Sequence, residues 1–302
     1  MDLFDLHCDT LFECLKDNKS LYSNDLAVSL EKGKTINNWC QTFAVFTPDD
    51  LRGKVAVEHY EKAVELFKNE CNLHSDYIVH CKSKHDIITA NANNKCAAIL
   101  SVESGAILDG DITAVDKIIA DGVKIFGLTW NGDNELASGI FGTGKGLTDF
   151  GIEVINKLQD NDVIIDVSHL NERGFWQLVE ITKKPIIATH SNLRSIQNHK
   201  RNLTDEQFVA ICNSGGVVGI NFYNKFLGPD CFDKIYANIS QMIELGGEDH
   251  IAFGSDFDGC DIEEKLNSIE KTIDLFNYLL QRGLNDDTLN KLCYLNALNL
   301  FK

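Results

Sequence analysis

Eight short apolar runs, rich in β-branched residues, recur along the 302-residue chain. They read as nearly continuous hydrophobic stretches without strict alternation, a pattern typical of parallel strands covered on both faces. Because parallel neighbours need a crossover connection, helices are expected between the runs. The predicted strands are 3–9, 39–46, 97–103, 124–130, 163–169, 186–190, 217–222 and 251–257.

Helical periodicity fills the segments between these runs. Within 147–158 the apolar residues recur at spacings of three and four, which places them on one helical face. Similar stripes occur at 54–70, 111–121, 171–182, 204–213 and 231–245. The segment 268–302 reads as two helices divided near Gly283. We therefore predict an α/β protein whose residues 1–302 form one TIM-like (β/α)8 barrel. A doubly wound open sheet is the alternative, but no Gly-rich dinucleotide fingerprint supports it.

Charge and cysteine usage exclude several classes of function. The 28 basic and 45 acidic residues give a net charge of −17, which disfavours binding to nucleic acid and to anionic membranes. No apolar run has the length of a membrane span, and a polar cluster at 5–10 comes too early to leave room for a signal peptide. The ten cysteines form no C-x-x-C pair, so reduced thiols are expected. We expect a cytoplasmic protein.

Unusual polar residues concentrate at five predicted strand ends, where a barrel of this kind carries its chemistry. Since side chains alternate along a strand, His7 and Asp9 share one face and Cys8 points to the other. Each histidine or carboxylate taken alone is better explained as a hydrogen-bonded structural residue or a helix cap. The residues expected to converge are His7, Asp9, Glu103, His169, His190 and Asp256.

Three imidazoles and three carboxylates at one barrel mouth would carry a heavy desolvation cost without a cation, so a metal site is the better explanation. Neutral imidazole and carboxylate suit Zn²⁺, and Glu103 is the natural carboxylate to bridge two ions. Two such ions, roughly 3.5 to 4 Å apart, can share a hydroxide and polarise a scissile carbonyl. Asp256, outside the predicted ligand set, is suited to accept the water proton and return it to a leaving amine.

A series of short motifs recurs in a familiar order along nearly the whole chain. The motifs stand at 5–9, 102–105, 128–131, 166–169, 188–191, 201–203, 221–224 and 254–259. In order and spacing they resemble the renal, or membrane, dipeptidase family of binuclear zinc peptidases in the amidohydrolase superfamily. The resemblance implies a hydrolase that cleaves small dipeptides with two Zn²⁺ per chain, and it implies tolerance of a D-residue at the C-terminal position and a homodimer.

The same resemblance implies roles for individual residues. The implied ligands are His7, Asp9 and Glu103 for one zinc, and Glu103, His169 and His190 for the other, with Glu103 as the bridge. Asp256 falls on the catalytic aspartate of the family, and Arg201 on the arginine that grips the terminal carboxylate of the substrate. Without the resemblance, Arg201 reads as a solvated loop charge. Tyr223 matches a pocket residue.

The chain departs from the family pattern at Trp130, where mammalian members carry a histidine thought to contact the substrate carbonyl or the tetrahedral intermediate. Asn131 is the candidate to supply a hydrogen-bond donor instead, while zinc alone, with Trp130 packed against the barrel, is the alternative. We expect a protein without the secretory signal and lipid-anchor tail of the mammalian enzymes, because the sequence resembles the soluble bacterial branch.

Two other functions remain as alternatives. One is a different binuclear hydrolase on this scaffold, a lactonase or a deaminase. Such enzymes usually bridge their metals with a carbamylated lysine on the fourth strand, whereas here that strand ends in Thr129 and Trp130, which favours a dipeptidase. The other is a barrel that binds without catalysis, and the presence of every predicted ligand argues against it.

Several further residues receive a supporting role. Asp258 shares a strand face with Asp256 and is expected to cap a helix or to support the site. The glycine-rich segment 139–146 lacks the phosphate-loop pattern and is expected to form a mobile loop over the mouth. Surface or structural roles are expected for His59, His74, His80, His85, His199 and His250.

Overall fold

A computed structural model describes residues 1–302, and its strands form one parallel sheet. Eight strands follow one another in the order β7-β6-β5-β4-β2-β1-β9-β8. They are β1 (Leu3–Cys8), β2 (Trp39–Phe46), β4 (Cys96–Glu103), β5 (Val123–Gly127), β6 (Ile164–Asp166), β7 (Ile186–Ile187), β8 (Val218–Ile220) and β9 (Ile251–Phe253). A ninth, β3 (Ile78–His80), pairs with β4 outside this ring.

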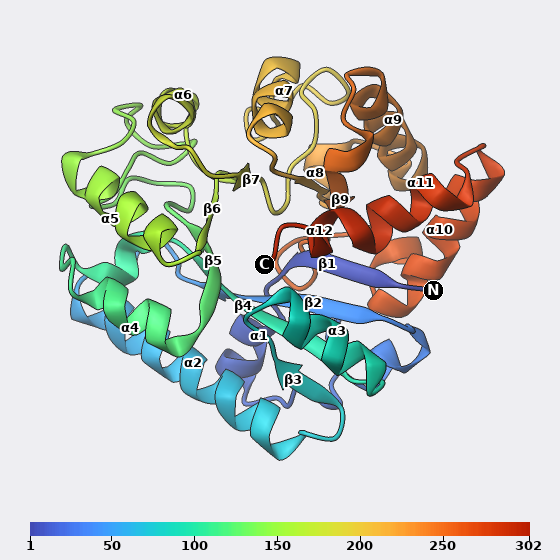
Figure 1. The fold of residues 1–302 in the computed structure, drawn as a ribbon, viewed down its shortest axis with the longest axis horizontal. Coiled ribbons are helices and arrows are strands. Elements are labelled where there is room, and N and C mark those ends of the chain that lie inside the picture. Colours follow the sequence, from blue (N-terminus) through green and yellow to red (C-terminus); the bar gives the residue numbers. More distant parts are fainter.

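The ring of eight strands nearly closes, because an isolated parallel bridge joins Ala188, next to β7, to Val218 in β8. Figure 1 shows the helices arranged around these strands. The predicted single (β/α)8 barrel is confirmed, and the open-sheet alternative is wrong. Every predicted strand overlaps an observed one. The short β3 was not predicted, since a run of three residues carries too little apolar pattern.

The α-helices agree with the predicted stripes and add several short elements. They are α1 (Thr10–Asp17), α2 (Lys54–Leu73), α3 (Lys84–Ala92), α4 (Ala114–Asp121), α5 (Asp149–Asp160), α6 (Glu172–Ile181), α7 (Asp205–Asn213), α8 (Asn224–Leu227), α9 (Cys231–Glu244), α10 (Thr272–Gln281), α11 (Asp286–Asn290) and α12 (Asn296–Leu298). Short 3₁₀ turns lie at Lys32–Thr35, Gly105–Leu108, Glu248–His250, Glu264–Leu266 and Ile269–Lys271, and a π-helical turn at Lys291–Leu295. None of these helices has both the length and the apolar content needed to cross a membrane.

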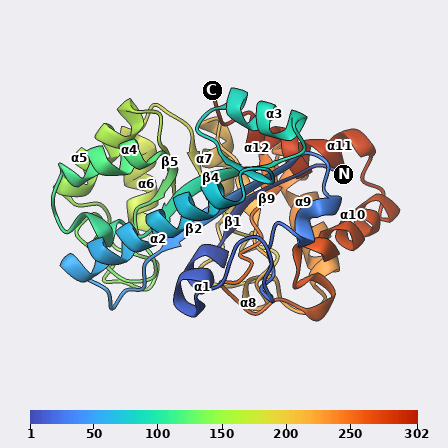
Figure 2. The same cartoon turned by 90° about the horizontal axis from the view of Figure 1, so that it is seen from below.

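Two apolar cores hold the barrel together. The larger lies between the strands and the surrounding helices, and the smaller fills the barrel interior. The strand residues of the inner core are Phe4, Leu6, Cys40, Ala97, Ile99, Ile125, Ile187 and Ala252. Phe301 stacks on Phe4 with ring centroids 5.6 Å apart. Figure 2 places α3, α12 and the C-terminus at one end of the barrel, and α1 and α8 at the opposite end. Since α1 directly follows β1, the polar strand ends open at the end that carries α1 and α8.

A β-bulge in β1 directs His7 toward the barrel interior. The register on β2 pairs Asp5 with Gln41 and Cys8 with Phe43. Three steps along β1 therefore match two along β2, which inserts one extra residue. Leu6 belongs to the inner core and Cys8 to the outer core, so the extra residue allows Leu6 and His7 both to face inward. Strict alternation would instead have placed His7 on the outer face with Asp5.

The buried carboxylate of Asp5 ties together the strands around this bulge. It accepts hydrogen bonds from Gln41 Nε2 at 2.7 Å, from Ser255 N at 2.8 Å and from Ser255 Oγ at 2.7 Å. Burial raises the pKa of Asp5, although these hydrogen bonds oppose the rise. Asp5 thus fixes β1 to β2 and to the segment that follows β9, on the far side of the sheet from His7.

We predict that Asp5→Ala lowers the free energy of unfolding by about 2–4 kcal/mol, because three buried donors lose their acceptor. Urea denaturation followed by circular dichroism measures the effect. The matched control is Asp50→Ala, which removes an exposed carboxylate and should leave the midpoint unchanged. Equal midpoints for the two variants would contradict the structural role of Asp5.

Candidate metal centre

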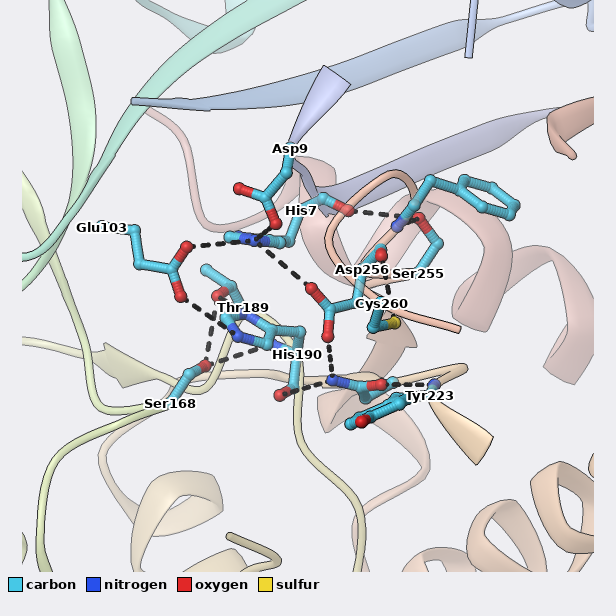
Figure 3. A network of polar contacts seen from close by, with 12 residues as sticks. His7, Asp9, Glu103, Ser168, Thr189, His190, Tyr223, Ser255, Asp256 and Cys260 are labelled. Atoms are coloured by element: carbon cyan, nitrogen blue, oxygen red, sulfur yellow. Dashed lines mark hydrogen bonds and ion pairs between the residues drawn. The ribbon is translucent and has the colours of Figure 1, made fainter. Parts of the chain in front are cut away.

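The predicted polar residues meet at the barrel mouth, and each is less than 9 % exposed. His7 stands at the centre of one half of the cluster (Figure 3). Its Nε2 lies 3.4 Å from Asp9 Oδ2, 3.5 Å from Glu103 Oε2 and 3.7 Å from Asp256 Oδ1. Three carboxylates from different strand ends therefore surround a single imidazole.

The other half of the cluster contains two imidazoles that face the second oxygen of Glu103. Glu103 Oε1 lies 2.8 Å from His169 Nε2 and 3.6 Å from His190 Nε2. The two imidazole nitrogens are 3.0 Å apart. The two oxygens of Glu103 thus face different sets of donor atoms, as a carboxylate that bridges two cations must.

A second layer of hydrogen bonds orients His190. Thr189 Oγ1 donates its only proton to Asp166 Oδ2 at 2.6 Å, so it can only accept from His190 Nδ1, which lies 2.8 Å away. Nδ1 of His190 therefore carries the proton, and the lone pair of Nε2 points into the cluster. Ser168 Oγ also donates to Asp166, at 2.7 Å, and accepts from the backbone N–H of His190 at 3.1 Å.

His169 has two competing partners for its outer nitrogen. Its Nδ1 lies 3.2 Å from Asn131 Oδ1 and 3.3 Å from Arg201 Nε. The amide oxygen needs a protonated Nδ1, whereas the guanidinium, which only donates, needs an unprotonated one. Only one of these hydrogen bonds forms at a time, so the protonation of His169 decides whether Asn131 or Arg201 holds it.

The electrostatics of the cluster favour a bound cation. Burial lowers the pKa of His7, but the carboxylates of Asp9 and Glu103 more than reverse this and raise it to about 10. Burial raises the pKa of Glu103 and of Asp256, whose carboxylates lack enough positive partners. Burial lowers the pKa of His169 well below its usual value, with Arg201 adding to the effect. Imidazole is therefore kept neutral there, as a metal ligand requires.

The donor atoms at the mouth fit metal ions. Donor atoms of His7, Glu103 and His190 lie within 4.8 Å of one another, and so do those of His7, Asp9 and Asp256. Asp9 Oδ1 is buried without a hydrogen-bond partner, a costly arrangement unless a cation faces it. The set contains only imidazole nitrogens and carboxylate oxygens, which suits Zn²⁺.

A cavity of about 580 Å³ opens above this cluster. Its lining includes the predicted residues Asn131 and Tyr223, together with Trp130. Asp258 also lines it, but its oxygens accept hydrogen bonds from Thr10 Oγ1 at 2.5 Å and from Ala27 N at 2.7 Å, which suits a supporting role.

Arg201 lies behind His169 and is only 2 % exposed. It is not among the residues that line the cavity. Its Nη1 donates to Ser191 Oγ at 2.8 Å and its Nη2 to the carbonyl of His190 at 3.1 Å. With Nε directed at His169, two of the five guanidinium N–H groups remain for another acceptor. Arg201 is therefore a buried charge and no solvated loop residue.

Sequence reasoning missed several residues that line the cavity. They are Phe12, Glu13, Phe46, Pro48, Phe141, Lys225, Phe226, Gly259 and Cys260. His199, expected at the surface or in a structural role, lines the cavity as well. Phe46 is the last residue of a predicted strand, and this position at a strand end could have identified it as a residue of the barrel mouth. Phe12 and Glu13 lie in α1, and Lys225 and Phe226 lie in α8, two short helices that no apolar stripe predicted. The rest lie on connecting segments, whose paths the apolar pattern does not determine. The segment 139–146 borders the cavity through Phe141.

Comparisons with known proteins agree with this geometry. A family model described as membrane dipeptidase (peptidase family M19) matches residues 1–302. The chain belongs to the membrane dipeptidase family. A Klebsiella pneumoniae protein described as an uncharacterized protein in the pqqA 5′ region is 36% identical over 236 residues, which cover 74% of this chain and 87% of that protein. An uncharacterized dipeptidase of Schizosaccharomyces pombe is 32% identical, with 72% of this chain and 55% of that protein covered.

Solved structures show that the membrane dipeptidase fold extends over the whole chain. A metallopeptidase described as dipeptidase AC of family M19 has a TM-score of 0.94 at 23% identity, covering 99% of this chain and 97% of the other. A Rhodobacter sphaeroides metallopeptidase bound to a phosphinate mimic of L-Ala-D-Ala has a TM-score of 0.90 at 22% identity, covering 99% and 98%. At such identities the likeness establishes the fold, while family membership supports a hydrolase that uses metal ions.

We predict that His190→Ala loses bound metal, whereas Asp256→Asn retains the wild-type content, because Asp256 is assigned outside the ligand set. Asn also tolerates the left-handed backbone at this position, where φ is 62°. Elemental analysis of protein purified without chelator measures the content. The control is His85→Ala, which removes an exposed imidazole. Metal loss in Asp256→Asn equal to that in His190→Ala would make Asp256 a ligand.

Proposed function

We propose that this member of the family is a zinc-dependent dipeptidase whose residues 1–302 act as one catalytic domain. The observation that carries the proposal is the position of Glu103, with one oxygen facing His7 and the other facing His169 and His190. Family membership supports dipeptides as the substrate class.

Two Zn²⁺ ions per chain are the proposed cofactors. His7, Asp9 and Glu103 would hold one ion, and Glu103, His169 and His190 the other. Ions held there would supply Lewis-acid chemistry: they would acidify a shared water to hydroxide and polarise the scissile carbonyl. The protein contributes the fixed donor atoms and excludes bulk water, since every ligand is less than 9 % exposed.

Asp256 is proposed to move the proton during hydrolysis. Its Oδ2 accepts a hydrogen bond from Asn221 Nδ2 at 2.9 Å, and its Oδ1 faces the cluster, 3.7 Å from His7 Nε2. Burial raises the pKa of Asp256, which brings a carboxyl group closer to the pH at which it can both accept and return a proton. Asp256 would take the proton of the attacking water and deliver it to the leaving amine.

Arg201, Tyr223 and Asn131 are proposed to bind the substrate. The two N–H groups that Arg201 keeps free match the two oxygens of a terminal carboxylate. Asn131 faces His169 with its oxygen, so its Nδ2 remains as a donor for the substrate carbonyl. Tyr223 lines the cavity on the side of Arg201, with its ring against Phe226, over which the guanidinium also lies.

Three finer points complete the proposal. The mimic bound to the Rhodobacter sphaeroides metallopeptidase carries D-Ala at its C-terminal position, which supports tolerance of a D-residue there in this enzyme. The ten cysteines are all free thiols, which supports action in a reducing compartment such as the cytoplasm. We further propose a homodimer, from the resemblance to the family; light scattering of the purified protein tests it.

Asp256→Asn should lower kcat for dipeptide hydrolysis by about 100- to 10,000-fold, the range expected for losing a general base. Release of free amino acids from a panel of L,L and L,D dipeptides, with added zinc, provides the measurement. The panel also includes a lactone and a nucleobase. Wild-type activity in Asp256→Asn would refute its proton-transfer role, and turnover of the lactone or nucleobase without any dipeptide would refute the proposed function.

Arg201→Ala should raise KM for free dipeptides much more than for their C-terminal amides, because only the free acids present a carboxylate to the guanidinium. The ratio of kcat/KM for acid and amide, compared between wild type and variant, isolates this contact. Arg173→Ala, which removes an exposed arginine on α6, is the control. If wild-type enzyme cleaves acids and amides equally well, Arg201 does not bind the carboxylate.

A further inference from the structure

Three aromatic side chains form a continuous wall on one side of the cavity. The rings of Phe12 and Phe46 lie 5.1 Å apart at 67°, and those of Phe46 and Trp130 lie 5.0 Å apart at 68°. Both contacts are edge-to-face, an arrangement that aromatic rings prefer. All three side chains line the cavity and remain partly exposed. Packing alone therefore leaves apolar surface facing the space that a substrate would occupy.

The wall is supported from behind. His59 in α2 contacts the carbonyl oxygen of Phe46 through Nε2 at 2.8 Å, and its ring lies 5.8 Å from that of Phe12. The rings come from three separate segments: α1, the last residue of β2 and the segment after β5. This fixed, partly uncovered surface has the character of a binding subsite.

The wall stands opposite the residues proposed to hold the substrate carboxylate. In the strand ring, the segments that carry the wall follow β1, β2 and β5, whereas Arg201 follows β7 and Tyr223 follows β8. Glu103 ends β4, between the strands of the wall. A dipeptide with its carboxylate at Arg201 and its peptide bond over the metal ligands therefore extends its N-terminal residue toward the wall.

We propose that Phe12, Phe46 and Trp130 form the subsite for the N-terminal side chain, and that the enzyme prefers dipeptides whose N-terminal residue is large and apolar. This inference rests on the proposed dipeptidase function. A side chain such as Phe or Leu removes its own apolar surface and that of the rings from water. An acidic side chain would lose hydration against the three rings, and the wall offers no cation to pair with it.

The charges around the cavity support this orientation of the dipeptide. The wall itself carries no cation. Lys225 lies on the opposite side, with its Nζ 5.7 Å from the centre of the Tyr223 ring. Positive charge near the carboxylate end and apolar surface near the amino end match the two ends of a dipeptide with a hydrophobic first residue.

The test compares kcat/KM of zinc-loaded enzyme for Phe-Ala, Leu-Ala, Ala-Ala and Glu-Ala. Phe-Ala and Leu-Ala should exceed Ala-Ala by about 10-fold or more, with Glu-Ala the poorest, since apolar contacts of this size discriminate by about 10- to 200-fold. If no dipeptide is cleaved, the proposed function fails. If Ala-Ala or Glu-Ala is cleaved at least as well as Phe-Ala, only the subsite inference is overturned.

Substitutions then test whether the three rings cause the preference for an apolar N-terminal residue. In Trp130→Ala the ratio of kcat/KM for Phe-Ala over Ala-Ala should fall toward one, while the ratio for Ala-Phe over Ala-Ala keeps its wild-type value. Trp176→Ala, a partly exposed tryptophan on α6, is the control and should keep both ratios. Phe12→Ala provides a second test if Trp130→Ala does not fold. A Phe-Ala preference that persists in the folded variant would overturn the assignment.

Discussion

Glu103 ends β4 with both carboxylate oxygens buried, one facing His7 and the other facing His169 and His190. No single protonation state satisfies all of these groups together with Asp9 and its unpartnered oxygen. Positive charge between the carboxylates resolves the conflict, because imidazole lone pairs and carboxylate oxygens can then share the same centre. The barrel holds these donors in place despite their desolvation cost, and family membership identifies the purpose as metal-dependent hydrolysis.

Two further carboxylates, outside the cluster, position its members. Asp5 holds the strands beneath the bulge that directs His7 inward. Asp166 accepts the hydroxyl proton of Thr189, and Thr189 Oγ1 in turn accepts the proton on Nδ1 of His190. Asp5 acts through the Gln41 amide and through the backbone N–H and hydroxyl of Ser255, whereas Asp166 acts through backbone N–H and hydroxyl groups alone; neither belongs to the proposed ligand set. Aromatic rings from α1, β2 and the segment after β5 line one side of the cavity, and in the strand ring they stand opposite the segments that follow β7 and β8.

The sequence was sufficient to predict the barrel and the convergence of its polar strand ends, because parallel strands place their carboxyl ends at one mouth. Strict alternation predicted that His7 and Asp9 share a face, but only the register on β2 reveals the bulge that places His7 on the same side as Leu6. Phe12 escaped prediction because it lies in α1, a short helix without a predicted apolar stripe, and His199 because it lies on a connection whose course depends on tertiary packing. The roles proposed for Arg201 and Asp256 come from the family resemblance, because the apolar pattern and strand alternation place these residues without assigning their chemistry.

Anomalous diffraction at the zinc absorption edge, from crystals of zinc-loaded protein, tests the central claim most directly. The account predicts two peaks, one beside each oxygen of Glu103, with His7 and Asp9 at one and His169 and His190 at the other. A single peak, or two peaks that do not share Glu103, would contradict it.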